Sequence, residues 1–164
     1  MAEPPGFRAG IVTISDTRSS GERADTTTAV IRDTLEPARF TVTDAVLVPD
    51  EREAIEAALV RLCDEDGCDV VLTTGGTGLG PRDVTPEATR AVCDRDVPGF
   101  PEAVRAITGA ANPKAYLSRA VAGQRARTLI VNLPGSPDGV REALEVLLPL
   151  LGHAVKVARG GGHP

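Results

Sequence analysis

The sequence predicts a single-domain α/β fold of three layers, in which a mostly parallel sheet carries helices on both faces. In the first half of the chain, short β-branched apolar runs alternate with amphipathic stretches, which is the pattern of repeated strand–helix–strand units. The length of 164 residues suits one domain. Hydrophobic residues make up 41% of the chain and charged residues 25%, so neither a disordered chain nor a coiled coil is expected.

Three strands and two helices account for the first half of the chain. Each strand is a short β-branched run, such as Ile11-Val12-Thr13-Ile14, followed by turn-forming residues. Pro37 ends the first helix because proline cannot continue one. Ile55, Leu59 and Leu62 recur at helical spacing and predict the second helix. In order, the expected elements are strand 9–15, a helix from about Asp25 to Pro37, strand 40–48, helix 51–66 and strand 69–74.

The second half of the chain is less regular. Thr85 as N-cap and Pro86 at the first helical position predict a helix that begins there. Gly123-Gln124 suits a turn between two strands. Apolar residues spaced by three and four from Val140 to Leu151 predict a long closing helix. The other expected elements are helical stretch 101–107, strand 116–123, strand 127–132 and helix 137–158.

We expect one domain at residues 7–158, a flexible N-terminus at 1–6 and a disordered tail at 159–164. The tail contains Gly160-Gly161-Gly162, which favours disorder. The first six residues lack the basic and apolar regions of a secretory signal. No apolar run is long enough to span a membrane, so no membrane partner is expected.

Composition also argues against binding to nucleic acid and against secretion. The net charge of −5 and the aromatic content of 2% do not suit a protein that binds DNA or RNA. Cys63, Cys68 and Cys93 form an odd set without a CxxC pair or a histidine at metal-ligand spacing, so we expect reduced, partly buried thiols. Reduced thiols predict the cytoplasm as the location of the protein.

The most informative segment is a glycine-rich loop that follows the third strand. Four glycines within six residues, from Gly75 to Gly80, let the backbone approach a ligand and point N–H groups at an anion. Arg82 and Asp83 place a phosphate partner beside a metal ligand. Neither a Walker A lysine nor the GxGxxG spacing is present. A flexible loop with a solvated Arg-Asp pair is the alternative interpretation.

Carboxylates that follow different strands are candidates for binding Mg²⁺. The carboxyl ends of parallel strands meet at one edge of a sheet, so Asp50 and Asp83 are expected to converge. Mg²⁺ prefers oxygen ligands and substrate phosphates. Asp50 also suits the N-cap of the helix that starts at Glu51, and Asp16 has the same ambiguity in the turn after the first strand.

A second candidate segment is 132–137, where a strand ends and Ser136 precedes a helix that begins with Pro137. The free N–H groups of a helix start bind anions, although simple capping by Ser136 explains the same residues. Ser118-Arg119 is consistent with ordinary hairpin polarity. The expected site contains no Ser/His/Asp or Cys/His set, so nucleophilic hydrolysis is not expected.

Taken together, these segments resemble the MogA/MoaB family of molybdenum cofactor biosynthesis proteins, which includes the G domains of gephyrin and of plant Cnx proteins. The segments 73–78 and 82–89 are similar to the signature of that family. The resemblance covers about residues 7–152. It includes Ile14-Ser15-Asp16, Val48-Pro49-Asp50, Pro98-Gly99-Phe100, Leu117-Ser118-Arg119 and Asn132-Leu133-Pro134-Gly135-Ser136.

The resemblance implies a molybdopterin-binding fold that assembles as a homotrimer, or as a hexamer in MoaB branches. It also implies the Mg²⁺-dependent adenylylation of molybdopterin by ATP, which gives adenylyl-molybdopterin and pyrophosphate. By the same resemblance, Asp50 and Asp83 are the catalytic and metal-binding acids. The implied substrate-binding residues are Ser15, Asp16, Thr74, Gly75, Gly76, Thr77, Gly78, Arg82, Ser118, Pro134, Gly135 and Ser136.

The sequence is also compatible with three alternatives to this function. Residues 118–123 and the compact length are as similar to MoaB as to MogA, so the first is a MoaB-like molybdopterin-binding protein without adenylyltransferase activity. The second is a molybdate-insertion domain of the MoeA type, which belongs to a much longer chain. The third is a generic anion-binding α/β protein, which would bind no pterin.

Overall fold

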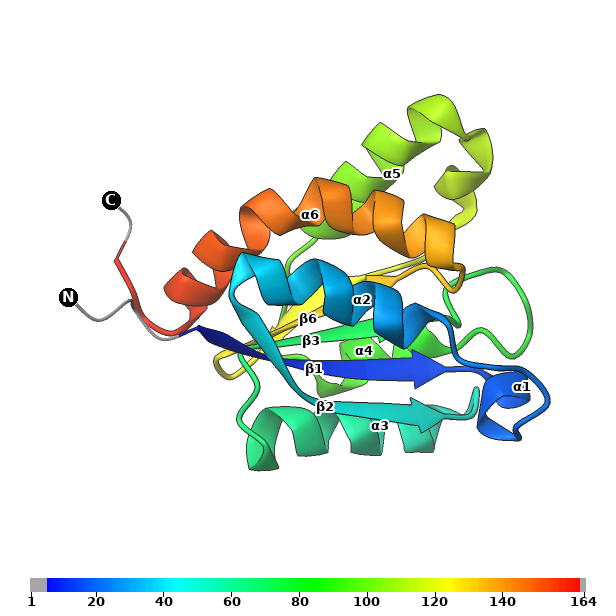
Figure 1. Ribbon diagram of the computed structural model, residues 1–164, viewed down its shortest axis with the longest axis horizontal. Helices are drawn as coiled ribbons and strands as arrows, with labels where there is room; N and C mark the ends of the chain where they lie inside the picture. The colour runs from blue at the N-terminus through cyan, green and yellow to red at the C-terminus, as the bar shows by residue number, and fades with distance from the viewer. Residues whose placement is uncertain (1–5, 163–164) are drawn as a thin grey trace.

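Six strands form one sheet in the order β2-β1-β3-β6-β5-β4 (Figure 1). The computed structural model describes residues 6–162. Four strands run parallel in the middle and at one edge of the sheet, and two short antiparallel strands complete the other edge. The strands are β1 (Phe7–Ile14), β2 (Phe40–Val48), β3 (Val70–Thr74), β4 (Arg95–Asp96), β5 (Ala122–Arg125) and β6 (Thr128–Leu133).

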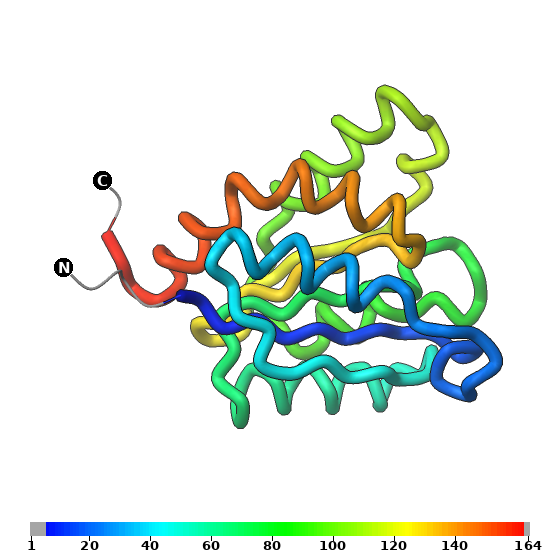
Figure 2. Tube along the Cα trace, in the orientation of Figure 1, coloured from blue at the N-terminus to red at the C-terminus, as the bar shows by residue number. Residues whose placement is uncertain are grey.

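Helices cover both faces of the sheet, which confirms the predicted three-layer α/β architecture (Figure 1). One face carries α2 (Thr27–Leu35), α5 (Gly99–Ala111) and α6 (Pro137–Ala158), and the other carries α3 (Arg52–Val60) and α4 (Thr85–Val92). The tube in Figure 2 shows α5 rising away from the sheet beside α6. The shorter helical elements are α1 (Asp16–Ser19), the 3-10 turns Glu36–Ala38 and Pro113–Leu117, and a π-helical turn, Arg61–Glu65, that continues α3.

The central strands β1, β3 and β6 are largely apolar because both of their faces are buried. Side chains alternate between the two faces of a strand. Ile11 packs in the cluster under α2 and α6, whereas Val12 packs in the cluster against α3 and α4. Leu72 and Val71 divide between the same two clusters in β3. This double burial explains why the sequence shows continuous apolar runs rather than alternating ones.

The predicted strand at residues 116–123 is wrong over most of its length. Residues Pro113–Leu117 form a 3-10 turn after α5, and β5 begins only at Ala122. The Tyr116 ring occupies the space beside Gly109, where a side-chain carbon would lie 2.5 Å from the ring, so this turn stays packed against α5. The hairpin turn is also displaced from the predicted Gly123-Gln124, because Arg125 pairs with Thr128 and Ala126 has φ +49°.

The folded chain extends slightly past the predicted boundary at residue 158. Arg159 forms an ion pair with Asp69 and lies over the Phe7 ring, 4.9 Å from its centre. The Gly161 N–H donates to the carbonyl of Lys156 at 3.0 Å. Residues 1–5 of the predicted flexible N-terminus and residues 163–164 of the predicted tail lie outside the described residues.

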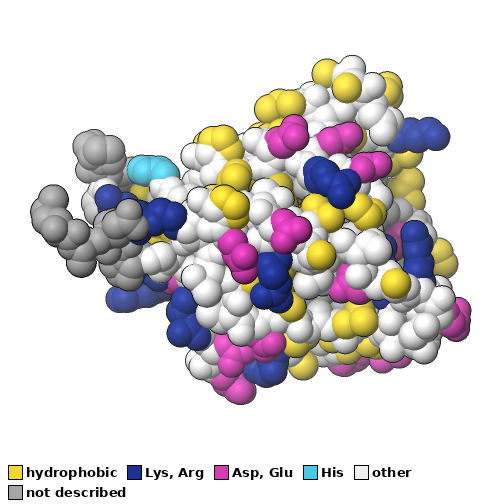
Figure 3. All heavy atoms as spheres, viewed as in Figure 1, with side chains coloured by type: hydrophobic (Ala, Val, Ile, Leu, Met, Phe, Trp, Pro, Cys, Tyr) yellow, Lys and Arg dark blue, Asp and Glu magenta, His cyan; other side chains and the backbone are white. Residues whose placement is uncertain are grey.

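The surface over α2 and α6 carries charged side chains of both signs (Figure 3). Acidic and basic side chains lie interspersed over α2 and α6, so this face has no continuous basic surface of the kind that nucleic acid binders use (Figure 3). Over residues 6–162, no helix combines the length and the apolar character needed to cross a membrane.

A buried amide joins four parts of the fold. The side chain of Asn132 on β6 is 4% exposed, and its Nδ2 donates to the hydroxyls of Thr73 and Thr89, each at 2.9 Å. Its Oδ1 accepts from the N–H of Val121 at 3.1 Å. Asn132 therefore connects β6 to β3, to α4 and to the segment before β5.

Replacement of Asn132 by alanine is expected to lower the free energy of unfolding by roughly 2–4 kcal/mol, because buried polar partners lose their bonds. Chemical denaturation measures this change. Asn112→Ala is the control, since Asn112 is exposed and caps only the turn at Lys114, and it is expected to change stability by less than about 1 kcal/mol. Equal effects of the two substitutions would contradict the role of Asn132.

Candidate active site

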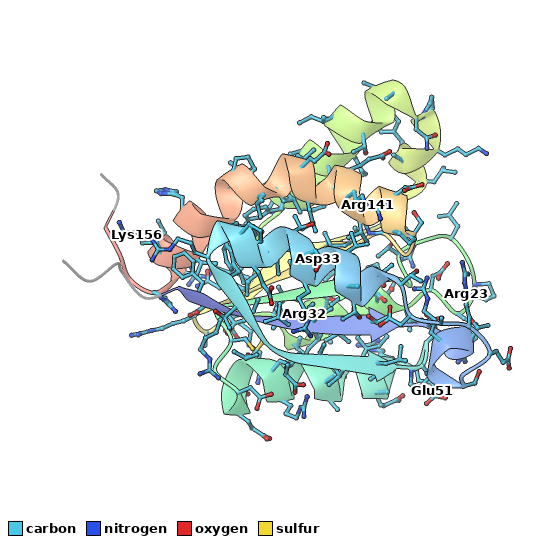
Figure 4. The ribbon with its side chains drawn as sticks, in the orientation of Figure 1. Arg23, Arg32, Asp33, Glu51, Arg141 and Lys156 are labelled. Carbon is cyan, nitrogen blue, oxygen red and sulfur yellow. The ribbon has the colours of Figure 1, made fainter. Side chains whose placement is uncertain are left out.

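The candidate site lies where four parallel strands end at one edge of the sheet (Figure 1). Ser15 follows β1, Asp50 follows β2, Gly75 follows β3 and Pro134 follows β6. Figure 4 shows Glu51 and Arg23 at this same end of the molecule. The predicted convergence of the strand ends is therefore present in the structure.

The glycine loop after β3 is pressed against neighbouring backbone. Gly75 and Gly76 have φ values of +99° and +68°, and a side-chain carbon on Gly75 would lie 2.3 Å from the carbonyl oxygen of Ile14. The Thr85 hydroxyl donates to the carbonyl of Gly75 at 2.9 Å, and the Thr85 N–H donates to that of Gly76 at 3.1 Å. Glycine is needed at both positions, and the start of α4 fixes the loop.

Asp16 and Asp50 hold the ends of β1 and β2 together by reciprocal hydrogen bonds. The Asp16 N–H donates to Oδ2 of Asp50, and the Asp50 N–H donates to Oδ1 of Asp16, both at 2.9 Å. The Arg82 guanidinium then binds both carboxylate oxygens of Asp16, at 2.9 and 3.0 Å. Asp16 thus connects Asp50 to Arg82, which lies at the end of the glycine loop.

The two carboxylates differ in their electrostatic environment. Hydrogen bonds from the Arg82 guanidinium hold the pKa of Asp16 below its ordinary value. Partial burial raises the pKa of Asp50, and the charges of Asp16 and Asp83 act in the same direction, against the lowering effect of the Asp16 N–H. The charge of Arg82 also lowers the pKa of Asp50, but its guanidinium binds Asp16, so no ion pair to Asp50 forms within residues 6–162. A partly buried carboxylate of this kind suits a metal ligand.

Asp50 and Asp83 face the glycine loop from two sides. A side-chain carbon on Gly76 would lie 3.2 Å from Oδ1 of Asp50, and one on Gly78 or Gly80 would lie 2.9 Å from Oδ2 of Asp83. Asp83 Oδ2 also accepts from the Gly80 N–H at 2.9 Å. No set of three or more His, Cys, Asp or Glu side chains suited to a metal occurs within residues 6–162. Asp50 and Asp83 supply carboxylate oxygens, the ligand type that Mg²⁺ prefers, and Mg²⁺ takes its other ligands from water and substrate phosphates.

Arg119 is a site residue whose role the sequence analysis missed. Its Nε donates to the carbonyl of Gly78 and its Nη2 to that of Asp83, both at 2.7 Å, and Nη1 pairs with Glu87. Its own N–H donates to the carbonyl of Thr77 at 2.8 Å. Arg119 clamps both ends of the loop, although the resemblance to the family at residues 117–119 was the only sequence signal for it.

The remaining predicted residues lie on the β6 side of the loop. The Thr74 hydroxyl donates to the carbonyl of Pro134 at 2.6 Å, and a side-chain carbon on Gly135 would lie 3.4 Å from Cα of Gly75. Ser15 and Ser136 cap α1 and α6 through their hydroxyls. The capping interpretation of Ser136 is therefore confirmed, and its hydroxyl stays partly exposed at the site.

A cavity of about 230 Å³ adjoins the loop on this side. Asn112, Asn132 and Arg105 line it together with apolar residues such as Val104 and Val131. Four of the predicted substrate-binding residues also line it: Thr77, Ser118, Pro134 and Ser136. The predicted site residues thus divide into an acidic side at the ends of β1 and β2 and a cavity side at the end of β6. Ser118 belongs to the cavity rather than to the acidic side.

Comparison with known proteins identifies the family. Residues 10–153 match the family model described as a probable molybdopterin binding domain. The chain is 42% identical over 156 residues to a molybdopterin adenylyltransferase of Helicobacter pylori, covering 92% of this chain and 87% of the relative. It is 45% identical over 151 residues to that of Escherichia coli K12, covering 91% and 77%. A crystal structure of the molybdopterin biosynthesis enzyme MoaB of Thermus thermophilus superposes with a TM-score of 0.90, at 52% identity, over 94% of this chain and 97% of that one.

Replacement of Arg119 by glutamine is expected to loosen the glycine loop, because two carbonyls and Glu87 lose their donor. Hydrogen–deuterium exchange should become faster at residues 77–83 and stay unchanged in β1 and β6. Arg52→Gln is the matched control, since the ion pair of Arg52 is with Glu56 on the exposed side of α3 and Glu87 acts on Arg52 through its charge. If residues 77–83 of Arg119→Gln exchange as slowly as those of wild type, Arg119 does not hold the loop in place.

Asp50→Asn is expected to stabilise the free protein at neutral pH. The folded state raises the pKa of Asp50 above 3.8, so wild-type stability falls as pH rises through the interval between 3.8 and the raised value, and stays lower above it. An asparagine oxygen still accepts the Asp16 N–H. Melting curves in EDTA should show the variant above wild type near pH 7 and level with it near pH 3. Asp16→Asn should show the opposite sign, since the pKa of Asp16 is lowered.

Proposed function

The chain belongs to the family of molybdopterin-binding domains, and on that basis we propose that it is a molybdopterin adenylyltransferase of molybdenum cofactor biosynthesis. In this reaction an oxygen of the terminal phosphate of molybdopterin forms a bond to the α-phosphorus of ATP. The bond from that phosphorus to the oxygen bridging it to the β-phosphate breaks, and pyrophosphate leaves with the bonding electrons. The observation that carries the proposal is the pair Asp50 and Asp83, which flanks a backbone loop suited to phosphates.

Asp50 and Asp83 would hold Mg²⁺ between the glycine loop and the substrate phosphates. Bound there, Mg²⁺ would neutralise phosphate charge and orient the leaving pyrophosphate. The protein itself contributes a rigid arrangement: Asp16 fixes Asp50, the Gly80 N–H fixes Asp83, and Arg119 fixes the loop between them. Phosphoryl-type transfer depends mainly on such positioning and on charge, which suits a site without a nucleophilic side chain.

The cavity beside β6 is suited to the heterocyclic ring of one of the two substrates. Its volume of about 230 Å³ and its mixed lining of amide, guanidinium and aliphatic groups match a flat ring with polar edges. A ring placed there lies next to Thr77 and Ser136, so the attached phosphates would extend over the loop towards Asp50 and Asp83.

We also propose that copies of the chain associate, as a homotrimer or, if the protein is of the MoaB type, as a hexamer. Ile107, Tyr116 and Leu117 expose more than half of their side chains on α5 and the turn after it, where apolar surface suits a protein contact. A cytoplasmic location is part of the proposal, since Cys63, Cys68 and Cys93 are all free thiols.

The second candidate function is molybdopterin binding without adenylyl transfer. The observation that favours it is the solved structure at 52% identity, which carries the MoaB name. The presence of both Asp50 and Asp83 favours the transferase, because a protein that only binds the pterin has no need of acids on the far side of the loop.

Asp83→Ala is expected to abolish turnover while pterin binding largely survives. Single-turnover reactions with molybdopterin, ATP and Mg²⁺ measure the product, and the loss should reach about a hundredfold or more, as for groups that stabilise transition-state charge. Asp33→Ala serves as the control, because Asp33 lies on α2 away from the strand ends (Figure 4).

The outcome separates the candidate functions. Stoichiometric adenylyl-molybdopterin from wild type that is lost in Asp83→Ala supports the transferase. Pterin binding without product supports the MoaB-like binding protein. Turnover of Asp83→Ala within about threefold of wild type would overturn the catalytic assignment of this residue, because loss of a charge-stabilising group costs more.

A further inference from the structure

Arg18 is a buried cation that no described carboxylate neutralises. The residue is 7% exposed, although it belongs to the four-residue helix α1 at the surface. The ion pairs within residues 6–162 involve other arginines. An unpaired buried charge destabilises a protein unless a ligand or partner compensates it. Arg18 therefore needs a reason for its position.

The contacts of Arg18 leave most of its donors unused. Nη1 and Nη2 both lie 3.4 Å from a single acceptor, the carbonyl oxygen of Gly135, and Nε is buried with no acceptor. A guanidinium carries five N–H donors in a fixed fork, so three of them have no acceptor in the described structure. A hydrogen bond to one carbonyl requires neither the five donors of a guanidinium nor its charge.

The position of the guanidinium brings it beside another feature that attracts anions. Gly135 directly precedes Ser136, the N-cap of the 22-residue helix α6, and the start of a long helix carries partial positive charge. Gly135 also packs against Gly75 in the glycine loop. The acid in the first turn of α6, Asp138, has a side chain that is 91% exposed and pairs with Arg141. It is therefore not the partner of Arg18.

We propose that Arg18 and the start of α6 form a phosphate-binding subsite beside the glycine loop. The paired N–H groups of a guanidinium match two oxygens of a phosphate, which arginine binds better than it binds a single carbonyl. The assignment of this phosphate to molybdopterin or to the nucleotide rests on the proposed function. The binding of an inorganic phosphate or pyrophosphate ion does not rest on it.

Arg18→Gln distinguishes a ligand-binding role from a structural one. The glutamine amide still offers a donor to the Gly135 carbonyl but removes the buried charge. If Arg18 serves a ligand, the free variant keeps the wild-type melting temperature or exceeds it. If Arg18 serves only the fold, the free variant melts lower.

Calorimetric titration with inorganic pyrophosphate, at constant ionic strength and without Mg²⁺, tests the subsite directly. We expect saturable binding to wild type and binding roughly tenfold or more weaker to Arg18→Gln, with Arg18→Lys in between. Arg141→Gln is the matched control, because Arg141 lies in the first turns of α6 but pairs with Asp138 (Figure 4). It should bind like wild type. Equal affinity of Arg18→Gln and wild type, or no saturable binding to wild type, would overturn the proposal.

Turnover then identifies the source of the phosphate. A rise in KM for ATP alone in Arg18→Lys assigns the subsite to the nucleotide, and a rise in KM for molybdopterin alone assigns it to the pterin substrate. Unchanged values of both would remove the subsite from the reaction. Pyrophosphate binding is measured without turnover, so the subsite can stand even if wild type proves to have no adenylyltransferase activity.

Discussion

The contact of Gly75 with the end of β1 is the constraint on which the rest of the site depends. A side-chain carbon at this position would collide with the Ile14 carbonyl, so the chain can leave β3 along this path only as glycine. A side-chain carbon at Gly76 would likewise collide with the Thr85 side chain and lie close to that of Asp50. The loop consequently runs in contact with the ends of β1 and β2 rather than above them. Backbone N–H groups and carboxylates from three strands therefore share one small volume.

The charges in that volume are only partly compensated. Asp16 is satisfied, because Arg82 binds both of its oxygens. Burial and two neighbouring carboxylates raise the pKa of Asp50. Arg18 is buried, and its Nε has no acceptor in the described part of the chain. Both groups destabilise the free protein. In the proposed complex, a phosphate would compensate the charge of Arg18 and a divalent cation that of Asp50. Charged groups arranged in this way lower the stability of the free protein. They need little rearrangement when the substrate binds, and such preorganised groups stabilise the charge that develops during a reaction.

The sequence predicts the parallel part of the fold because strand and helix signals there are local. β-branched runs and helical spacing locate β1, β2, β3, β6 and α6, and Pro86 marks the start of α4. Residues 116–123 were misassigned because β-propensity cannot register the packing of Tyr116 on Gly109, a contact between turn and helix. Arg119 and Arg18 were missed for a related reason. Their importance lies in which carbonyls they reach, and those carbonyls belong to residues far away in the sequence.

The division of the site into two sides explains why sequence similarity does not by itself separate a transferase from a binding protein. The cavity beside β6 is built by α5, the turn after it and α6, whereas Asp50 and Asp83 come from the ends of β2 and of the glycine loop. Only the loop itself belongs to both sides. Substitution of an acid would leave the cavity and the fold intact, so binding and transfer can be lost independently. This chain retains the acids together with the contacts that orient them, from Asp16, Gly80 and Arg119. Since contacts of that kind serve no purpose in a ring-binding cavity, the acidic side is the part of the structure that argues for chemistry.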